Sequence, residues 1–360
     1  MTGYGGSVDL YALTEADLGA ALAELGEPKY RAKQIRAWLY QKGAASFAEM
    51  TDLPASLRAK LAERFVLGSL AVTEEQTSRD GTIKRLYRLH DGQLIESVLM
   101  PYEDGRRTAC ISSQAGCAMG CVFCATGQMG FSRQLSSTEI FEQAALFSRE
   151  LQQKGERLSN IVFMGMGEPF ANFDAVIEAI GRLNRELGIG ARHITVSTVG
   201  LAPKIREFAD LGLQVKLAIS LHAATDAQRG ALLPVNKRWN IAELMEACRY
   251  YAETAGRRIS FEWALIAGTN DTVEEAERLG RLLQGLSCHV NLIPLNPTAA
   301  YDGGPTQAPE AGRFVAILER YGVPATVRVR RGIDIDAGCG QLKSNVIKKA
   351  RQVSEVVKPI

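Results

Sequence analysis

The sequence predicts an α/β protein built on a partial (β/α)6 barrel, with a small N-terminal helical domain and a linking β-hairpin. Three observations lead to this fold class. Residues 14–70 have the apolar spacing of amphipathic helices, residues 82–100 alternate around an Asp91-Gly92 pair, and from residue 108 short β-branched segments alternate with helical ones. Strands that alternate with helices run parallel and are joined by right-handed crossovers. About six such units favour a barrel over an open sheet.

The N-terminal elements have recognisable local signals. Thr14 and Asp17 match a capping box at the start of a helix, and two further helical segments follow. We therefore expect residues 1–75 to form a helical accessory domain. An Asp-Gly pair between alternating segments is the strongest short signal for a β-hairpin, so residues 76–107 are expected to form the linking hairpin.

The barrel is expected to occupy residues 108–345, followed by a basic tail at residues 346–360. Its helical segments have apolar faces. The predicted strands are residues 109–113, 160–163, 193–197, 215–220, 259–264, 290–294 and 326–329. The helical segments between them include residues 138–151, 173–187, 241–254, 272–286 and 309–321.

Polar and glycine-rich residues recur where these strands end. Barrels of this kind build their active sites from the loops after the carboxyl ends of the strands. The signals that follow five of the predicted strands are Cys117, Gly165–Pro169, Ser197, Ser220–His222 and Asn296-Pro297. A random arrangement would place them at both ends of the sheet, so the sequence predicts one site at the carboxyl end.

Composition limits the functional classes. The formal net charge of +2 gives no argument for a nucleic-acid partner, which must come from local clusters. The first residues lack the pattern of a signal peptide, and no segment reaches the roughly 20 apolar residues of a membrane span, so we expect a cytoplasmic protein without a membrane partner. Seven cysteines, an odd number, favour metal or redox chemistry over a disulfide scaffold.

The strongest chemical signal is the segment Cys117-Ala-Met-Gly-Cys121-Val-Phe-Cys124. Three thiolates from one loop can hold a cubane iron–sulfur cluster and leave one iron open for another ligand. A structural zinc site, or simple burial, is the alternative. Zinc sites normally take four protein ligands, and no fourth ligand stands at the usual spacing here.

This three-cysteine loop resembles the signature of radical S-adenosylmethionine (SAM) enzymes. The resemblance implies a [4Fe-4S] cluster bound by Cys117, Cys121 and Cys124, whose open iron chelates SAM and whose electron cleaves it to a 5′-deoxyadenosyl radical. Phe123 matches the aromatic residue near the adenine of SAM. The remaining cofactor-binding positions implied by the resemblance are Gly167, Glu168, Ser197, Ser220, Leu221, His222 and Asn296.

Two further cysteines narrow the resemblance. Cys110 precedes the cluster by seven residues, and Cys339 lies in a glycine-flanked loop near the C-terminus. Either thiol could simply be buried, the reading we prefer for Cys248 and Cys288. However, the sequence contexts of Cys110 and Cys339 resemble those of the RlmN-type adenine methyltransferases, and the resemblance to this family extends over nearly the whole chain. Pro169 favours this carbon-2 family over the sister family that methylates carbon 8, in which alanine is typical.

The resemblance implies a two-stage mechanism that consumes two SAM molecules per turnover. Cys339 first accepts a methyl group, from which the radical then removes hydrogen, and the resulting carbon radical forms a covalent adduct with the base. Glu96 matches the residue that accepts the proton of carbon 2, although alone it would be taken for a solvated strand carboxylate. Cys110 then attacks the sulfur of Cys339 and releases the methylated base, leaving a transient disulfide.

The implied substrates are 23S ribosomal RNA and transfer RNA, with an electron donor such as flavodoxin or ferredoxin, and we expect a monomer. Each basic cluster by itself fits a solvated surface as well as an RNA contact, but two of them flank the Cys339 loop and therefore favour RNA binding. On the same basis residues 1–75 are a candidate RNA-binding domain. One cluster lies in a predicted helix without acids, and others surround Cys339. These residues are Arg31, Lys33, Arg36 and Lys42, then Arg328, Arg330 and Arg331, and then Lys343, Lys348, Lys349 and Arg351.

Three alternatives remain open on the sequence. The first is methylation of carbon 8 of adenine. The second is a radical enzyme of the same fold acting on a small molecule or a protein, which leaves Cys110 and Cys339 unexplained. The third is a non-enzymatic metal-binding RNA module.

Overall fold

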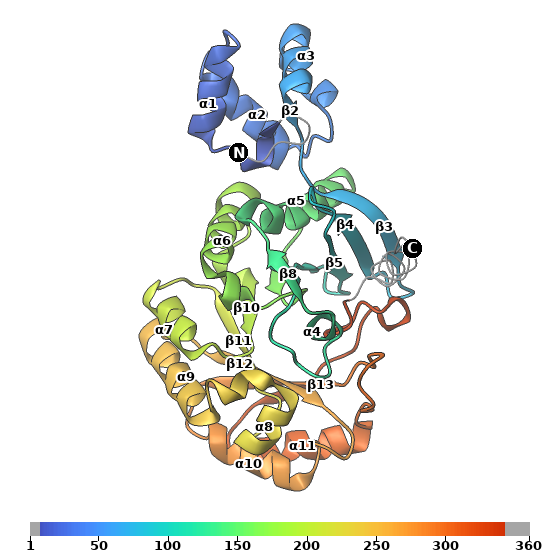
Figure 1. Ribbon diagram of the computed structural model, residues 1–360, viewed down its shortest axis with the longest axis vertical. Helices are drawn as coiled ribbons and strands as arrows, with labels where there is room; N and C mark the ends of the chain where they lie inside the picture. The colour runs from blue at the N-terminus through green and yellow to red at the C-terminus, as the bar shows by residue number, and fades with distance from the viewer. Residues whose placement is uncertain (1–7, 343–360) are drawn as a thin grey trace, which may run out of the picture.

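The computed structural model describes residues 8–342, and Figure 1 shows a group of helices standing at one end of an α/β body. Thr14 Oγ1 accepts a hydrogen bond from the amide of Asp17, whose carboxylate accepts one from the amide of Thr14. The predicted capping box is therefore present. The elements of this end are β1 (Val8–Asp9), α1 (Glu15–Glu24), α2 (Tyr30–Tyr40), α3 (Ala55–Arg64) and β2 (Phe65–Val66), which pairs in parallel with β1.

The body is built on one sheet of ten strands, in the order β14-β13-β12-β11-β10-β9-β6-β5-β4-β3. The seven strands from β14 to β6 are parallel neighbours. They are β6 (Arg107–Cys110), β9 (Asn160–Phe163), β10 (Ile194–Thr198), β11 (Lys216–Ser220), β12 (Ile259–Leu265), β13 (Cys288–Pro294) and β14 (Ala325–Val327). Within residues 8–342 the end strands β14 and β3 do not pair with each other, so the barrel is partial, as predicted.

Helices connect the parallel strands and cover the outer face of the barrel (Figure 1). Their apolar stripes pack onto buried strand residues such as Trp263 and Phe163. A capping box of Ser136 and Glu139 starts the first of them. The helices are α5 (Ser137–Gln153), α6 (Phe173–Leu187), α7 (Ala202–Asp210), α8 (Asp226–Leu232), α9 (Ile241–Ala255), α10 (Val273–Leu283) and α11 (Ala308–Arg320). No helix in the described part of the chain could cross a membrane.

The predicted hairpin is present, and it extends the barrel sheet. Strands β4 (Ile83–Arg88) and β5 (Leu94–Pro101) are antiparallel, and Gly92 in their turn has a φ of 81°. Strand β3 (Ala71–Thr77) pairs with β4, and β5 pairs with β6. The domain boundary proposed after residue 75 falls within β3. The proposed tail at residues 346–360 lies outside the described residues.

A second hairpin, which the sequence did not predict, encloses the cysteine loop. The first barrel strand ends at Cys110, not at residue 113, because the chain then turns into β7 (Gln114–Gly116). This strand pairs with β8 (Phe131–Gln134), and the short helix α4 (Ala125–Met129) lies between them. Gly116 permits this closure, since a Cβ atom there would lie 2.1 Å from the carbonyl oxygen of Gly130.

Candidate active site

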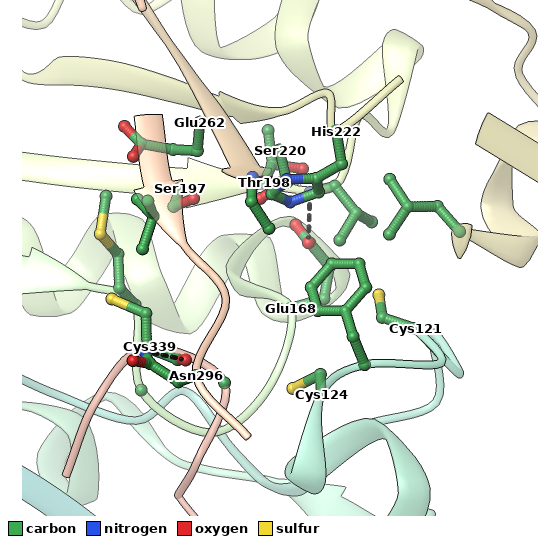
Figure 2. Close-up of a pocket in the computed structure, with 18 of the residues that line it drawn as sticks. Cys121, Cys124, Glu168, Ser197, Thr198, Ser220, His222, Glu262, Asn296 and Cys339 are labelled. Carbon is green, nitrogen blue, oxygen red and sulfur yellow. Dashed lines mark hydrogen bonds between the residues drawn. The ribbon is translucent and has the colours of Figure 1, made fainter. Parts of the chain in front are cut away.

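A cavity lies at the carboxyl ends of the parallel strands (Figure 2). It encloses about 890 Å³ of empty space, part of it open to solvent. Its wall is formed by the cysteine loop, by the ends of β9 to β13 and by the loop that contains Cys339. The predicted site residues that line it are Cys121, Phe123, Cys124, Gly167, Glu168, Ser197, Ser220, His222, Asn296 and Cys339.

The three cysteines of the loop interact with one another. Cys117 directly follows β7, Cys124 caps α4, and the amide of Cys124 donates to the carbonyl of Cys121. Burial, and to a lesser degree the charges of Glu168 and Cys124, raises the pKa of Cys117 to about 12. Burial and the charges of Cys124 and Cys117 hold the pKa of Cys121 well above its usual value. Buried thiols this close together become thiolates only when a cation joins them.

These thiols fit an iron–sulfur cluster better than a single ion. Within residues 8–342, no three Cys, His, Asp or Glu side chains are grouped closely enough to hold one metal ion. In a cubane each thiolate binds a different iron, so wider spacing is required. Three thiols on one loop, two of which line a cavity with space for a ligand, match a cluster with one iron free of cysteine.

Phe123 and His222 form an aromatic corner of the cavity. Their ring centroids lie 5.0 Å apart with an interplanar angle of 80°. His222 Nδ1 accepts a hydrogen bond of 2.8 Å from the amide of Ala264. Burial and the nearby Arg229 lower the pKa of His222 to about 3, so the ring is neutral and carries its proton on Nε2. Leu221 is fully buried beside this corner and does not line the cavity, so its cofactor role stays a prediction.

The glycine-rich loop after β9 is shaped by packing against β7. Gly167 has a φ of 103°, and a Cβ atom there would lie within 2.8 Å of Gln114. Glu168, only 2% exposed, accepts hydrogen bonds from the amides of Phe170 and Val199 at 2.9 and 2.8 Å. Burial raises the pKa of Glu168 to about 7, against the opposing effect of these bonds and of Thr198. Glu168 thus fixes the loop after β10 to the cavity wall.

Cys339 and Asn296 form the opposite part of the wall. Asn296 Nδ2 donates to the carbonyl oxygen of Cys339 at 3.0 Å, while its buried Oδ1 has no hydrogen-bond partner within residues 8–342 and remains an acceptor. Cys339 is exposed towards the cavity, yet enough protein surrounds its sulfur for burial to raise its pKa. After burial, the charges of Glu262 and Arg328 act most strongly on this thiol.

Cys110 lies behind the cavity at the end of β6 and is 8% exposed. Burial, and then the charge of Cys339, raises the pKa of Cys110 well above its usual value, so the two sulfurs are close enough to interact electrostatically. Both are free thiols in this structure. Cys248 and Cys288 are buried in the core, as expected for cysteines without a chemical role.

Glu96 is not the solvated strand carboxylate that its isolated pattern suggested. It lies in the middle of β5 and is 3% exposed, with Lys84 Nζ 3.8 Å from its Oε1. Lys84 Nζ also donates to the carbonyl oxygen of Asp336, three residues before Cys339. The ion pair therefore links Glu96 to the Cys339 loop, although Glu96 does not line the cavity.

Sequence reasoning missed two buried charged residues. Glu262 lines the cavity from β12 and is the only acid in an otherwise apolar strand segment, a signal that could have identified it. Arg229 in α8 is fully buried and donates to the carbonyl oxygen of Val199 at 2.6 Å and to Asn236 Oδ1 at 2.9 Å. Through its bond to Val199, Arg229 helps to fix the position of the loop after β10.

The structure changes the interpretation of the predicted basic clusters. The positive face of α2 is largely neutralised by acids from other segments, since Arg31 pairs with Glu27, Arg36 with Glu15 and Glu186, and Lys42 with Asp52. Near the Cys339 loop, in contrast, Arg328 and Arg330 are exposed, and Arg331 lies over the ring of Tyr102. Lys343, Lys348, Lys349 and Arg351 lie outside the described residues.

Comparison with known proteins gives matches along the whole chain. Residues 8–67 match the model of the ribosomal RNA large subunit methyltransferase N-terminal domain, and residues 111–283 match the radical SAM superfamily. The chain is 52% identical over 349 residues to dual-specificity RNA methyltransferase RlmN 1 of Myxococcus xanthus, covering 96% of this chain and 97% of the relative. It is 46% identical over 342 residues to the probable dual-specificity RNA methyltransferase RlmN of Geobacillus kaustophilus, covering 94% and 93%.

A solved structure agrees with these sequence matches. The crystal structure of a radical SAM methyltransferase from Sphaerobacter thermophilus is 50% identical and superposes with a TM-score of 0.89, covering 93% of this chain and 99% of the other.

Proposed function

The chain belongs to the RlmN family of radical SAM RNA methyltransferases, and we propose that it methylates carbon 2 of an adenine in 23S ribosomal RNA and in transfer RNA. Family membership makes it a SAM-dependent RNA methyltransferase, which excludes the non-enzymatic metal-binding module. The observation that carries the proposal is the position of Cys339, which lines the same cavity as Cys121 and Cys124 and interacts with Cys110.

The family implies a [4Fe-4S] cluster and SAM, which together supply a hydrogen-abstracting radical when bound. In the proposal Cys117, Cys121 and Cys124 hold the cluster, and Phe123 and His222 enclose the adenine of SAM. The other proposed cofactor contacts are Gly167, Glu168, Ser197, Ser220, Leu221 and Asn296. This assignment is supported by the cavity, which nine of the eleven residues line.

Cys339 acts as the methyl carrier in the proposed reaction. Its sulfur must lose a proton before it can accept a methyl group from a first SAM, and the cavity gives it access to that cofactor. A second SAM is then needed to activate the methyl group, so each turnover consumes two. Because carbon 2 of adenine carries a hydrogen that no side-chain base removes readily, a radical route through a methylated cysteine is chemically reasonable.

Glu96 and Cys110 complete the proposed reaction by releasing the base. Glu96 accepts the proton of carbon 2 in the covalent adduct, and the unpaired electron of the adduct would return to the oxidised cluster. Cys110 sulfur attacks Cys339 sulfur, the bond between that sulfur and the methylene carbon breaks, and its electron pair stays on the carbon, which is protonated to a methyl group. The resulting disulfide requires a dithiol reductant. The effect of the Cys339 charge on the pKa of Cys110 supports this step.

The proposed partners follow from this reaction. The exposed Arg328 and Arg330, which precede the Cys339 loop in the chain, are suited to the RNA backbone, which supplies most of the affinity for nucleic acids. The target adenine must leave its stack to enter the cavity. A ribosomal substrate implies a cytoplasmic protein, and flavodoxin or ferredoxin is the proposed electron donor to a monomeric enzyme.

Mass mapping of the modified nucleoside tests the proposal. The anaerobically prepared enzyme, with SAM and a reductant, is incubated separately with protein-free 23S ribosomal RNA and with transfer RNA. We expect 2-methyladenosine in both. Methylation of carbon 8 would assign the protein to the sister activity, for which Cys110 and Cys339 are equally suited, and the absence of any RNA methylation would reject the proposed function.

A further inference from the structure

A row of polar side chains crosses three neighbouring strands inside the barrel. In the parallel register Ser220 of β11 lies opposite Glu262 of β12, which lies opposite Asn291 of β13. Residues in register on adjacent strands point to the same face of a sheet. Because Ser220 and Glu262 both line the cavity, this polar row faces the active site and not the surrounding helices.

The carboxyl group of Glu262 is only partly used by the protein. The side chain is 6% exposed, and its Oε1 accepts a hydrogen bond of 2.8 Å from Asn291 Nδ2. Its other oxygen makes no hydrogen bond within the described residues. Since Glu262 lines the cavity, that oxygen is available to a bound molecule.

Glu262 belongs to the part of the cavity that contains Cys339. Figure 2 shows Glu262, Ser197 and Cys339 on one side of the view, and Cys121 and Cys124 on the other. Glu262 is also the charged residue with the largest electrostatic effect on the Cys339 thiol. Glu262 therefore lies in the part of the cavity that contains the proposed methyl carrier.

The chemistry of adenine makes this position informative. Carbon 2, nitrogen 1 and the 6-amino group all lie on the Watson–Crick edge of the base. A base that presents carbon 2 to Cys339 therefore brings its amino group, a hydrogen-bond donor, to the same side. Enzymes that act on an unstacked base commonly recognise it along this edge. A carboxylate oxygen is an acceptor that pairs with such a donor.

We propose that Glu262 is the residue that selects adenine, by accepting a hydrogen bond from the 6-amino group of the target base while Asn291 orients its carboxyl group. This inference rests on the proposed function, because it requires an adenine in the cavity. It also assigns a role to the one acid in β12, which the reaction described above does not use.

A substrate analogue combined with a side-chain deletion tests this contact. Two RNA hairpins are compared, one with adenosine and one with purine riboside, which lacks the 6-amino group, at the target position. For the unmodified enzyme, kcat/KM should fall about 10- to 100-fold on purine riboside, the range for a hydrogen bond to a charged group. For Glu262→Ala, kcat/KM should be low on adenosine and fall no further on purine riboside. Equal analogue effects in both enzymes would overturn the proposal.

Glu262→Gln provides a second test that does not depend on loss of activity. If the amide oxygen of the new side chain keeps the bond from Asn291, its NH2 group faces the base. The variant should then use inosine, whose 6-oxo group is an acceptor, better relative to adenosine than the unmodified enzyme does. An unchanged inosine-to-adenosine ratio would contradict the assigned orientation. Glu253→Gln, in which an exposed acid of α9 is replaced, is the matched control.

Two measurements separate this inference from the proposed function. Methylation of Cys339, measured by mass spectrometry before RNA is added, reports folding and cofactor binding. If the Glu262 variants fail at this stage, the residue serves the cofactor and the proposal is wrong. If the unmodified enzyme does not methylate carbon 2 of adenosine at all, the proposed function fails instead.

Discussion

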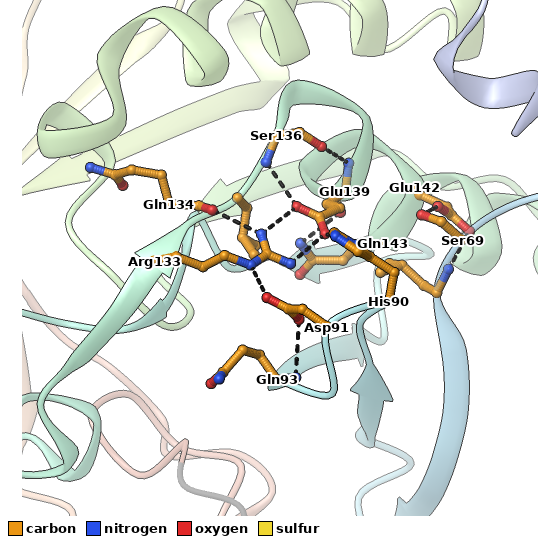
Figure 3. Close-up of polar contacts among 12 residues, drawn as sticks. Ser69, His90, Asp91, Gln93, Arg133, Gln134, Ser136, Glu139, Glu142 and Gln143 are labelled. Carbon is orange, nitrogen blue, oxygen red and sulfur yellow. Dashed lines mark hydrogen bonds and ion pairs between the residues drawn. The ribbon is translucent and has the colours of Figure 1, made fainter. Parts of the chain in front are cut away.

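Two groups of buried carboxylates in this protein differ in what surrounds them. In the network of Figure 3, Arg133 donates to both oxygens of Glu139 and also pairs with Asp91. Burial alone would raise the pKa of Glu139, but the bonds and the charge of Arg133 lower it overall. In the cavity, Glu168 and Glu262 have no ion pair within residues 8–342, and burial raises the pKa of both.

The difference indicates what each group is for. Arg133 holds together the turn of the β4–β5 hairpin, strand β8 and the capping box of α5, so its acids are fully used within the protein (Figure 3). The acids of the cavity are buried to a similar degree, but within residues 8–342 no cation forms an ion pair with them. Backbone amides donate to Glu168 and Asn291 donates to Glu262, while the charge of Arg328 lowers the pKa of Glu262 without outweighing burial. We therefore expect changes in the cavity to affect chemistry, and changes in the network to affect stability.

The largest effect is expected for Cys339→Ala. Removal of the carrier thiol should reduce RNA methylation to background, as measured by mass spectrometry of digested RNA. Because the thiol is exposed towards the cavity, the free energy of unfolding should change by no more than about 0.5 kcal/mol. The iron content and visible absorption of the cluster should be retained. Methylation that survives this substitution would disprove the carrier role.

Cys110→Ala should stop the reaction after the adduct with RNA has formed, whereas Cys339→Ala prevents its formation. Without the attacking thiol, the adduct between Cys339 and RNA cannot resolve, so product should not exceed one equivalent of enzyme. A denaturing gel should show protein that migrates with RNA. The control is Cys288→Ala, which removes another buried strand cysteine and should form no adduct. Normal multiple turnover by the Cys110 variant would contradict its role.

Arg133→Met should act on stability. It leaves Glu139, which is 5% exposed, without its cation and frees the hairpin turn at Asp91. We expect a loss of about 2 kcal/mol in the free energy of unfolding, between the values for surface and buried pairs. Arg313→Met breaks an exposed pair with Glu310 and should cost at most about 0.5 kcal/mol. Equal effects in a denaturant titration would remove the distinction drawn here.

Glu142→Gln should change how stability depends on pH. Glu142 is fully buried, accepts hydrogen bonds from the amide of Leu70 and from Ser69 Oγ (Figure 3), and has a raised pKa because of burial and the charge of Asp9. The folded protein therefore holds this proton more tightly than the unfolded chain. Its contribution to stability is greatest below the ordinary pKa of glutamate and declines as the pH rises towards the folded pKa.

The variant has no proton to lose at this position, so its stability should decline less over the same pH range, by on the order of 1 kcal/mol. Denaturant titrations at several pH values measure this slope. Parallel slopes for the two proteins would show that Glu142 titrates normally. Glu253→Gln, at an exposed site, should leave the slope unchanged.

The local patterns of the sequence predicted most of the architecture. The capping box of Thr14 and Asp17 and the Asp91-Gly92 turn depend on neighbouring residues, and alternating strands and helices allow few topologies. The cysteine loop was equally evident because its three ligands are close in sequence. The hairpin of β7 and β8 was missed, since its short strands are separated by the loop itself and carry no turn signal.

What the sequence determined by itself is the set of elements and the one loop in which three cysteines are neighbours, because propensity, capping and residue spacing act over a few residues. The tertiary structure alone decided which charged side chains are paired within the protein and which can contact a ligand. It buried Glu96 beside Lys84, paired Arg36 of α2 with the distant Glu186 and placed Glu262 in the wall of the cavity that Cys339 also lines. Burial and ion pairing depend on residues far apart in the chain, and no local pattern encodes them.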